Sequence, residues 1–289
     1  MKYTYFHLGI FCTILFLFTI GLLLFRWNGQ RKVQQQLNIL EQTVSRTSLP
    51  KIEKLPSIFR TGKETPHKDS PDFPISVKKE ILPQYQKLYE ENQDLIGWIE
   101  IPGTMLNFPV MYTPNDPTYY LYHLFDGTNS LYGMPFLDGD CSIEPRSTNL
   151  ILHGHHMLDG TMFSTLLEYQ DKNYFLSHPE IDFNTLYQEE KYAIISVFYW
   201  VYDEKDSSPD LYYNFIDAKD PADFDRFIAL VKELSFYDTG VSASYGDELL
   251  TLITCWDYQG NGRMNIVAKK IEPCALPGLL DSKKAQKTE

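Results

Sequence analysis

The longest apolar stretch of the chain lies near its start. Residues 3–25 carry no formal charge and are dominated by Leu, Ile and Phe. A run of this length is sufficient for a membrane-spanning helix, and the bulky residues after it offer no small-residue cleavage site. The pattern predicts an uncleaved signal anchor over 5–25, after a short cytoplasmic segment at 1–4. Basic residues on its two sides are nearly balanced, so the positive-inside rule leaves its orientation open.

Two segments of different composition follow this stretch. Val33, Leu37, Leu40 and Val44 form one stripe, which predicts a continuing helix over 31–46. A polar segment punctuated by proline then predicts an extended spacer up to about residue 76. We therefore expect a helical stalk and linker over 26–76, a globular domain over 77–272 and a polar tail over 273–289.

Within the domain, short apolar or alternating runs are separated by Gly, Pro, Asn and Asp clusters, which is typical of β-strands joined by turns. Helical spacing occurs in fewer places, and Asp220 is a suitable N-cap for the longest helix. We expect helices over 83–92, 161–169 and 221–234, and strands over 96–101, 108–112, 134–137, 149–155, 191–202, 248–256 and 264–271. Many strands and few helices favour a mainly β domain, a closed or nearly closed β-barrel, over a doubly wound sheet.

Charge and composition narrow the classes of function. The formal net charge is −12, although the first 32 residues are basic. Such an acidic domain is a poor nucleic-acid binder, so we expect no nucleic-acid partner. We find no phosphate loop, CxxC pattern or calcium-loop spacing, and expect neither cofactor nor metal. Whether Cys141 and Cys274 pair stays open.

Candidate chemistry lies near the end of the domain. Two strand-like runs flank a polar turn, and a loop closing symmetrically about Gln259 places Cys255 opposite Arg263. A permanently charged guanidinium favours the thiolate of a neighbouring cysteine, which is the nucleophilic form. Its NH groups also bind a carbonyl oxygen on which negative charge develops.

Nucleophilic chemistry of this kind also needs a proton donor for the leaving group. The histidine-rich stretch over 149–157 is the best place to look for it. A strand cysteine or a lone histidine is more often structural. A hydrogen-bonded structural role is our interpretation of His153, His67, His123 and His178. A metal site on His153 and His155 lacks an evident third ligand.

These stretches resemble the sortase family. Residues 251–255, Thr-Leu-Ile-Thr-Cys, match its TLXTC motif, Arg263 follows where the family has an arginine, and Gly154-His155 resembles its histidine segment. Further stretches are similar to class B sortases in particular: 92–104, 108–110, 136–138, 154–157 and 159–163. The resemblance covers about residues 80–272.

The resemblance implies a closed eight-stranded sortase-type barrel, with N-terminal helices and a helix inserted before the catalytic strand, which 220–234 fits. It also implies a cysteine transpeptidase of Gram-positive bacteria. The enzyme would be held in the cell membrane by a single-pass anchor, with its catalytic domain extracellular.

The implied reaction has two steps. Cys255 attacks a carbonyl in the C-terminal sorting signal of a secreted protein, Arg263 stabilises the oxyanion, and His155 protonates the leaving amine. An amine then resolves the acyl-enzyme and attaches the protein to the cell wall. The expected partners are surface proteins or pilins that bear sorting signals, and a cell-wall precursor amine or a pilin lysine as acceptor.

Neighbouring residues allow more than one interpretation. We expect Ile253, Thr254 and Trp256 to shape the substrate-binding groove or to pack. Asp257 either orients His155 or is a solvated turn residue. The alternatives for the whole protein are a pilin-polymerising class B sortase, a cysteine hydrolase that uses water, and a tethered binding protein. The sorting motif, the acceptor and the oligomeric state stay open.

Overall fold

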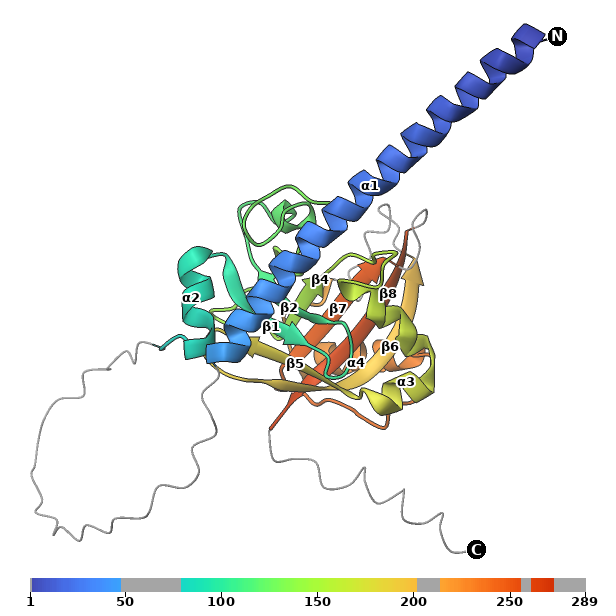
Figure 1. Ribbon diagram of the computed structural model, residues 1–289. Helices are drawn as coiled ribbons and strands as arrows, with labels where there is room; N and C mark the ends of the chain where they lie inside the picture. The colour runs from blue at the N-terminus through green and yellow to red at the C-terminus, as the bar shows by residue number, and fades with distance from the viewer. Residues whose placement is uncertain (1, 48–78, 202–213, 256–260, 273–289) are drawn as a thin grey trace, which may run out of the picture.

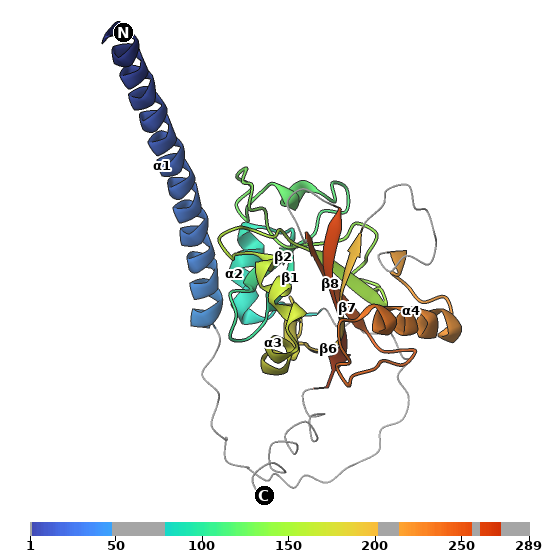
Figure 2. The same cartoon turned by 90° about the vertical axis from the view of Figure 1, so that its right-hand side faces the viewer.

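The computed structural model describes residues 2–47, 79–201, 214–255 and 261–272. A long helix, α1 (Lys2–Thr47), projects away from a barrel-shaped domain, and its second half lies against that domain (Figures 1 and 2). Val33, Leu37 and Leu40 of that half are buried, because they pack against the domain at α2 and β2. The predicted helix over 31–46 is therefore present, and its apolar stripe faces the domain.

The predicted membrane span is not supported. Within the residues that the structure describes, we find no helix long and apolar enough to cross a membrane. Several other predictions lie outside the described residues. They concern the spacer over 48–76, the tail over 273–289, Trp256, Asp257, His67 and Cys274.

The described part of the domain forms a closed barrel, which confirms the predicted architecture. Its strand order is β1-β2-β3-β4-β7-β8-β6-β5. The strands are β1 (Leu95–Glu100), β2 (Asn107–Met111), β3 (Phe136–Leu137), β4 (Asn149–His153), β5 (Glu180–Thr185), β6 (Lys191–Val201), β7 (Leu249–Cys255) and β8 (Gly262–Ile271). The pairs β2–β3 and β4–β7 are parallel, and the other neighbours are antiparallel. The parallel pairing of β4 with β7 is important for the site, because it brings together the carboxyl ends of two strands that are far apart in sequence.

Helices pack against the outside of the barrel. α2 (Pro83–Glu91) has proline in its first turn, where no backbone NH is needed. α4 (Pro221–Leu234) begins as predicted, with the Asp220 carboxylate accepting a hydrogen bond from the Asp223 NH at 2.8 Å. Its buried face lies on β6, where the Ser196 hydroxyl donates to the Val231 carbonyl. The remaining short helices are η1 (Tyr119–Leu121), η2 (Phe163–Gln170) and α3 (Lys172–Ser177).

Two elements were missed, and two local predictions need correction. β5 and α3 were not predicted, although β5 alternates half-buried and buried positions along its whole length. The predicted α-helix over 161–169 is a 3-10 helix that begins after Met162, whose φ of 55° lies in the left-handed region. The predicted strand over 149–155 ends at His153, so the next residues are free to leave the sheet.

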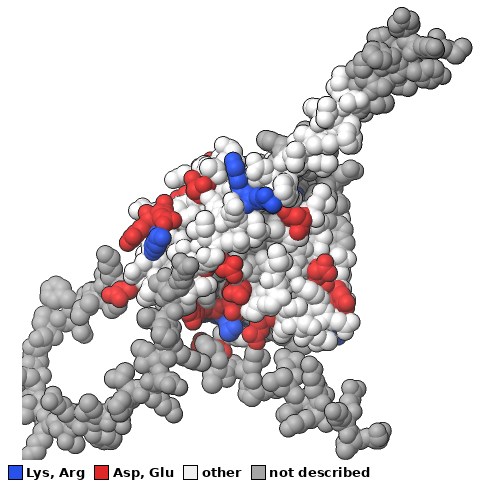
Figure 3. Space-filling view, viewed as in Figure 1, with Lys and Arg blue, Asp and Glu red and all other residues white. Residues whose placement is uncertain are grey.

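On the face seen in Figure 3, acidic side chains lie in several places with basic ones near them. This distribution agrees with the net charge of −12. Several basic side chains form ion pairs. For instance, Lys270 Nζ lies 2.8 Å from a carboxylate oxygen of Glu190 and 2.9 Å from one of Glu248.

Candidate active site

The β7–β8 hairpin carries two of the predicted catalytic residues. Its register pairs Cys255 with Arg263, as the symmetric turn predicted. Cys255 is the last residue of β7 and carries a half-buried, free thiol. Arg263 is half-buried, and its Nη1 donates to the Gly262 carbonyl at 3.0 Å. Directly opposite side chains in an antiparallel pair start about 5 Å apart, so the guanidinium lies within reach of groups bound at the sulfur.

Parallel pairing of β4 with β7 brings the third residue to the same level. His153 pairs with Ile253 at the end of the ladder. One residue further, the Gly154 NH donates to the Ile253 carbonyl at 3.2 Å, and the Thr254 hydroxyl donates to the Gly154 carbonyl at 2.8 Å. Because both chains run in the same direction, His155 follows at the level of Cys255.

The His155 ring has a defined orientation. Its Nε2 lies 2.7 Å from the Leu121 carbonyl oxygen at the end of η1. A carbonyl only accepts, so Nε2 carries a hydrogen and Nδ1 is the nitrogen whose protonation can change. The His155 backbone is held as well, because its carbonyl accepts from the Phe163 NH at 2.9 Å.

Gly154 is required by the packing beside His155. A Cβ at this position would stand 2.6, 2.7 and 2.8 Å from three ring carbons of Phe163. The ring itself is fully buried and has little room to move. Glycine therefore lets the histidine segment pass directly over the Phe163 ring.

We predict that Gly154→Ala lowers the free energy of unfolding by about 1–3 kcal/mol. The added methyl group forces the Phe163 ring or the backbone at residue 154 to shift, and His155 moves with that backbone. Urea denaturation and the rate of the catalysed reaction check the two effects. Gly29→Ala is the control, since a Cβ there meets nothing within 4 Å beyond its own stretch of helix; it should not lower stability, because alanine favours a helix more than glycine does. Equal stability of Gly154→Ala and the parent protein would contradict this packing argument.

The predicted substrate-binding residues lie at the end of β7. Ile253 and Thr254 are buried, with 5% and 2% of their surface exposed. The Thr254 hydroxyl is engaged with Gly154, as described above. Their contacts with a substrate stay predictions. Trp256 and Asp257, which follow, lie outside the described residues.

Three predicted structural histidines have hydrogen-bond partners. His123 Nδ1 lies 2.6 Å from the Tyr119 carbonyl oxygen, and His178 Nδ1 lies 3.1 Å from that of Tyr174. His153 Nε2 lies 2.7 Å from the Asp138 carboxylate. The hydrogen-bonded role predicted for these three residues is confirmed.

Asp138 is held in its ionised form at the β3–β4 edge. Burial raises the pKa of this carboxyl, but the hydrogen bond and charge of His153 and the Asp140 NH lower it, and the net direction is downward. The folded protein therefore binds the Asp138 proton less readily than the unfolded chain does.

The stabilisation that ionised Asp138 contributes should be lost in acid. It is present above the ordinary aspartate pKa of about 4 and is lost as the pH falls through the lower pKa of the folded state. We predict that Asp138→Asn costs about 1–3 kcal/mol at neutral pH and that its deficit shrinks in acid. Thermal unfolding across this range measures the difference. Asp140→Asn, an exposed carboxylate on the same turn, serves as the control; a deficit for Asp138→Asn that does not change with pH would contradict the argument.

His156 was given no role by the sequence. Burial lowers the pKa of His156, an interaction with the Cys255 backbone raises it, and the net direction is downward. The sequence offered one signal, which is that His156 alternates with His155 and so faces a different neighbour.

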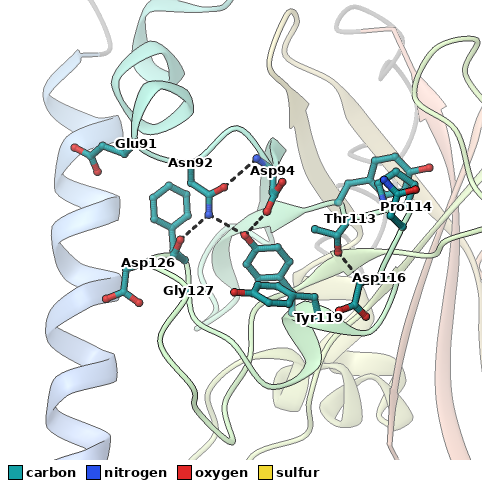
Figure 4. A pocket seen from close by; sticks show the side chains of 13 residues that line it. Glu91, Asn92, Asp94, Thr113, Pro114, Asp116, Tyr119, Asp126 and Gly127 are labelled. Carbon is teal, nitrogen blue, oxygen red and sulfur yellow. Dashed lines mark hydrogen bonds between the residues drawn. The ribbon is translucent and has the colours of Figure 1, made fainter.

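A cavity of about 420 Å³ lies beside η1 and contains none of the predicted catalytic side chains. At its wall, the Asn92 amide donates to the Phe125 carbonyl at 2.6 Å and to the Tyr120 hydroxyl at 2.8 Å, and Tyr120 donates to Asp94 at 2.8 Å (Figure 4). These polar groups satisfy one another. Tyr120 precedes Leu121, whose carbonyl faces His155.

Among the residues described by the structure we see no group of three His, Cys, Asp or Glu side chains placed to hold a metal ion. The three-residue site offers a nucleophilic sulfur, a fixed cation and an imidazole. Together these groups suit attack on a carbonyl followed by departure of an amine.

Comparison with known proteins points to one family. Residues 99–271 match the family model described as Sortase domain. Sortase B of Listeria monocytogenes is 30% identical over 199 residues, which cover 68% of this chain and 77% of that protein. The crystal structure of sortase B from Bacillus anthracis in complex with AAEK1 is 29% identical, with a TM-score of 0.59, over 66% of this chain and 86% of that one. The Staphylococcus aureus sortase B–substrate complex shares the fold, with a TM-score of 0.67 at 24% identity, over 85% of this chain and 99% of that one.

Proposed function

Because the chain belongs to the sortase family and is a class B cysteine transpeptidase, we propose that it attaches secreted proteins to the cell wall. In this proposal the enzyme cleaves a C-terminal sorting signal and passes the acyl group to an amine. The observation that supports it most directly is the register at the end of β7, where Cys255 pairs with Arg263 and lies level with His155.

The first step forms a thioester. The Cys255 sulfur attacks the scissile carbonyl carbon, and negative charge moves to the carbonyl oxygen. Arg263, on the facing strand, donates hydrogen bonds to that oxygen. The carbon–nitrogen bond then breaks, and the protonated His155 ring supplies a proton to the departing amine from Nδ1, while Nε2 stays bound to the Leu121 carbonyl.

The second step transfers the acyl group. An acceptor amine attacks the thioester carbonyl, neutral His155 takes up the proton that the amine loses, and the Cys255 sulfur departs. An amide bond has been exchanged for an amide bond, so the overall reaction consumes no water and needs no redox partner.

We place this reaction at the outer surface of the cell, with a cell-wall precursor as the amine. The support for this location is the family membership. A pilin lysine as acceptor, or water in a hydrolase, would use the same three residues. The acceptor is therefore decided by experiment.

The test uses the full chain with a panel of sorting-signal peptides, each with and without an added primary amine. Transpeptidation predicts a new product that contains both the peptide acyl group and the amine, and little cleavage without the amine. Cleavage at an equal rate with and without the amine, and with no joined product, would establish a hydrolase instead. Substituting a lysine-bearing pilin peptide for a small amine then distinguishes wall anchoring from pilus assembly.

A further inference from the structure

An exposed aromatic ring lies beside the His155 imidazole. The ring of Tyr122 is 6.0 Å from that of His155, centroid to centroid, with 46° between the two planes. Tyr122 leaves 51% of its surface exposed. Most tyrosine rings in folded proteins bury a large apolar area. This ring therefore has apolar surface available to a molecule bound at His155.

The same short turn holds both side chains. The carbonyl of Leu121, the last residue of η1, accepts from His155 Nε2 at 2.7 Å. Tyr122 follows directly. Its NH donates to the Tyr119 carbonyl at 3.3 Å, and its carbonyl accepts from the Ser130 NH at 2.8 Å. The Tyr122 backbone is thus fixed relative to His155 before any substrate binds.

The acceptor amine is the reactant that this ring suits. Its nitrogen must come within hydrogen-bond distance of His155, because the imidazole takes up a proton from it. That position is within reach of an aromatic ring centred 6.0 Å from the imidazole. A free alkylamine is an ammonium ion at neutral pH, and the face of a tyrosine attracts a cation within about 6 Å of its centroid. The amide nitrogen of the sorting signal carries no charge before its bond breaks, so it gains no such attraction.

We propose that Tyr122 binds the acceptor as an ammonium ion and so favours charged primary amines over neutral nucleophiles. The inference rests on the proposed function, because the acceptor is a reactant only in a transfer reaction. The net charge of −12 favours the approach of a cation in the same way. The bound ammonium loses one proton to water. It loses a second to neutral His155 as its nitrogen bonds the thioester carbon, and the Cys255 sulfur leaves as the thiolate.

Removing the ring should weaken the use of a charged acceptor. For transfer to ethylamine at neutral pH, the amine concentration that gives the half-maximal rate should rise about 2- to 5-fold in Tyr122→Ala. Tyr122→Phe keeps the ring and should recover most of this loss. Trifluoroethylamine is uncharged at neutral pH, so Tyr122→Ala should affect its use much less. Tyr245→Ala is the matched control, because that tyrosine is also 51% exposed and precedes β7 at the end of the strand away from Cys255.

Two kinetic results would overturn the proposal. Equal losses with ethylamine and trifluoroethylamine would show that the charge of the acceptor does not matter, as expected for a structural role. The rate of thioester formation without any amine gives the second test. If Tyr122→Ala slows this step as much as it slows transfer, the ring serves the sorting signal and not the acceptor.

Binding of the amine can also be measured without chemistry. In Cys255→Ala, which cannot form a thioester, ethylammonium should shift the NMR signals of the His155 ring. Adding Tyr122→Ala should weaken this binding by the same 2- to 5-fold or so. Unchanged binding would overturn the proposal even if transfer occurs. If the parent protein joins no peptide to any amine, the proposed function fails, and this titration still decides whether the ring binds an ammonium ion.

Discussion

Replacing Cys255 by alanine should reduce peptide transfer to the uncatalysed background, a loss of roughly 10⁴-fold or more. Without the sulfur no thioester forms, and the remaining Arg263 and His155 have no covalent intermediate to stabilise. Chromatography of the joined peptide–amine product measures the loss directly. Transfer by Cys255→Ala at more than about a hundredth of the parent rate would contradict the assignment of the nucleophile.

Cys141 provides the matched control for this variant. It is also a free thiol, but it is buried, and burial raises its pKa to about 12. Its sulfur donates to the Asn149 carbonyl and accepts from the Ile151 NH, so its role is packing between neighbouring segments. Cys141→Ala should reduce stability by about 1 kcal/mol and leave the rate of transfer of the folded protein unchanged.

Replacing His155 by asparagine should lower kcat by about 10²- to 10⁴-fold. Asparagine keeps an NH that can bond the Leu121 carbonyl, but it cannot exchange a proton with the leaving amine. The loss should therefore depend on the leaving group. An ester substrate, whose alkoxide leaves with less need of a proton, should be cleaved by His155→Asn with a much smaller deficit than the peptide.

The comparison of amide with ester separates proton transfer from mere packing. A structural defect would slow both substrates alike, and an equal loss on both would count against His155 as the acid. His178→Asn is again a suitable control, because that ring also bonds a backbone carbonyl. It should leave both rates near those of the parent protein.

Local sequence patterns predicted part of this site correctly. The pairing of Cys255 with Arg263 was predictable, because two strand-like runs joined by one short turn leave few registers. The closed barrel followed from the number of short strands between turn signals. β5 was missed although its alternation was present in the sequence, so that error was one of interpretation.

Other features of the site depend on contacts between distant segments, and no local pattern encodes them. The parallel pairing of β4 with β7 joins residues far apart in the chain, so the place of His155 beside Cys255 was suggested by the family resemblance alone. The Leu121 carbonyl that orients His155 comes from yet another segment.

Intact-mass spectrometry of the parent protein mixed with sorting-signal peptides tests the central claim most directly. We predict that one peptide adds the mass of its acyl fragment to the protein, that digestion places the adduct on Cys255, and that an added amine removes it and yields the joined product. An adduct on another residue, or an adduct on Cys255 that no amine removes, would contradict the account of a transpeptidase.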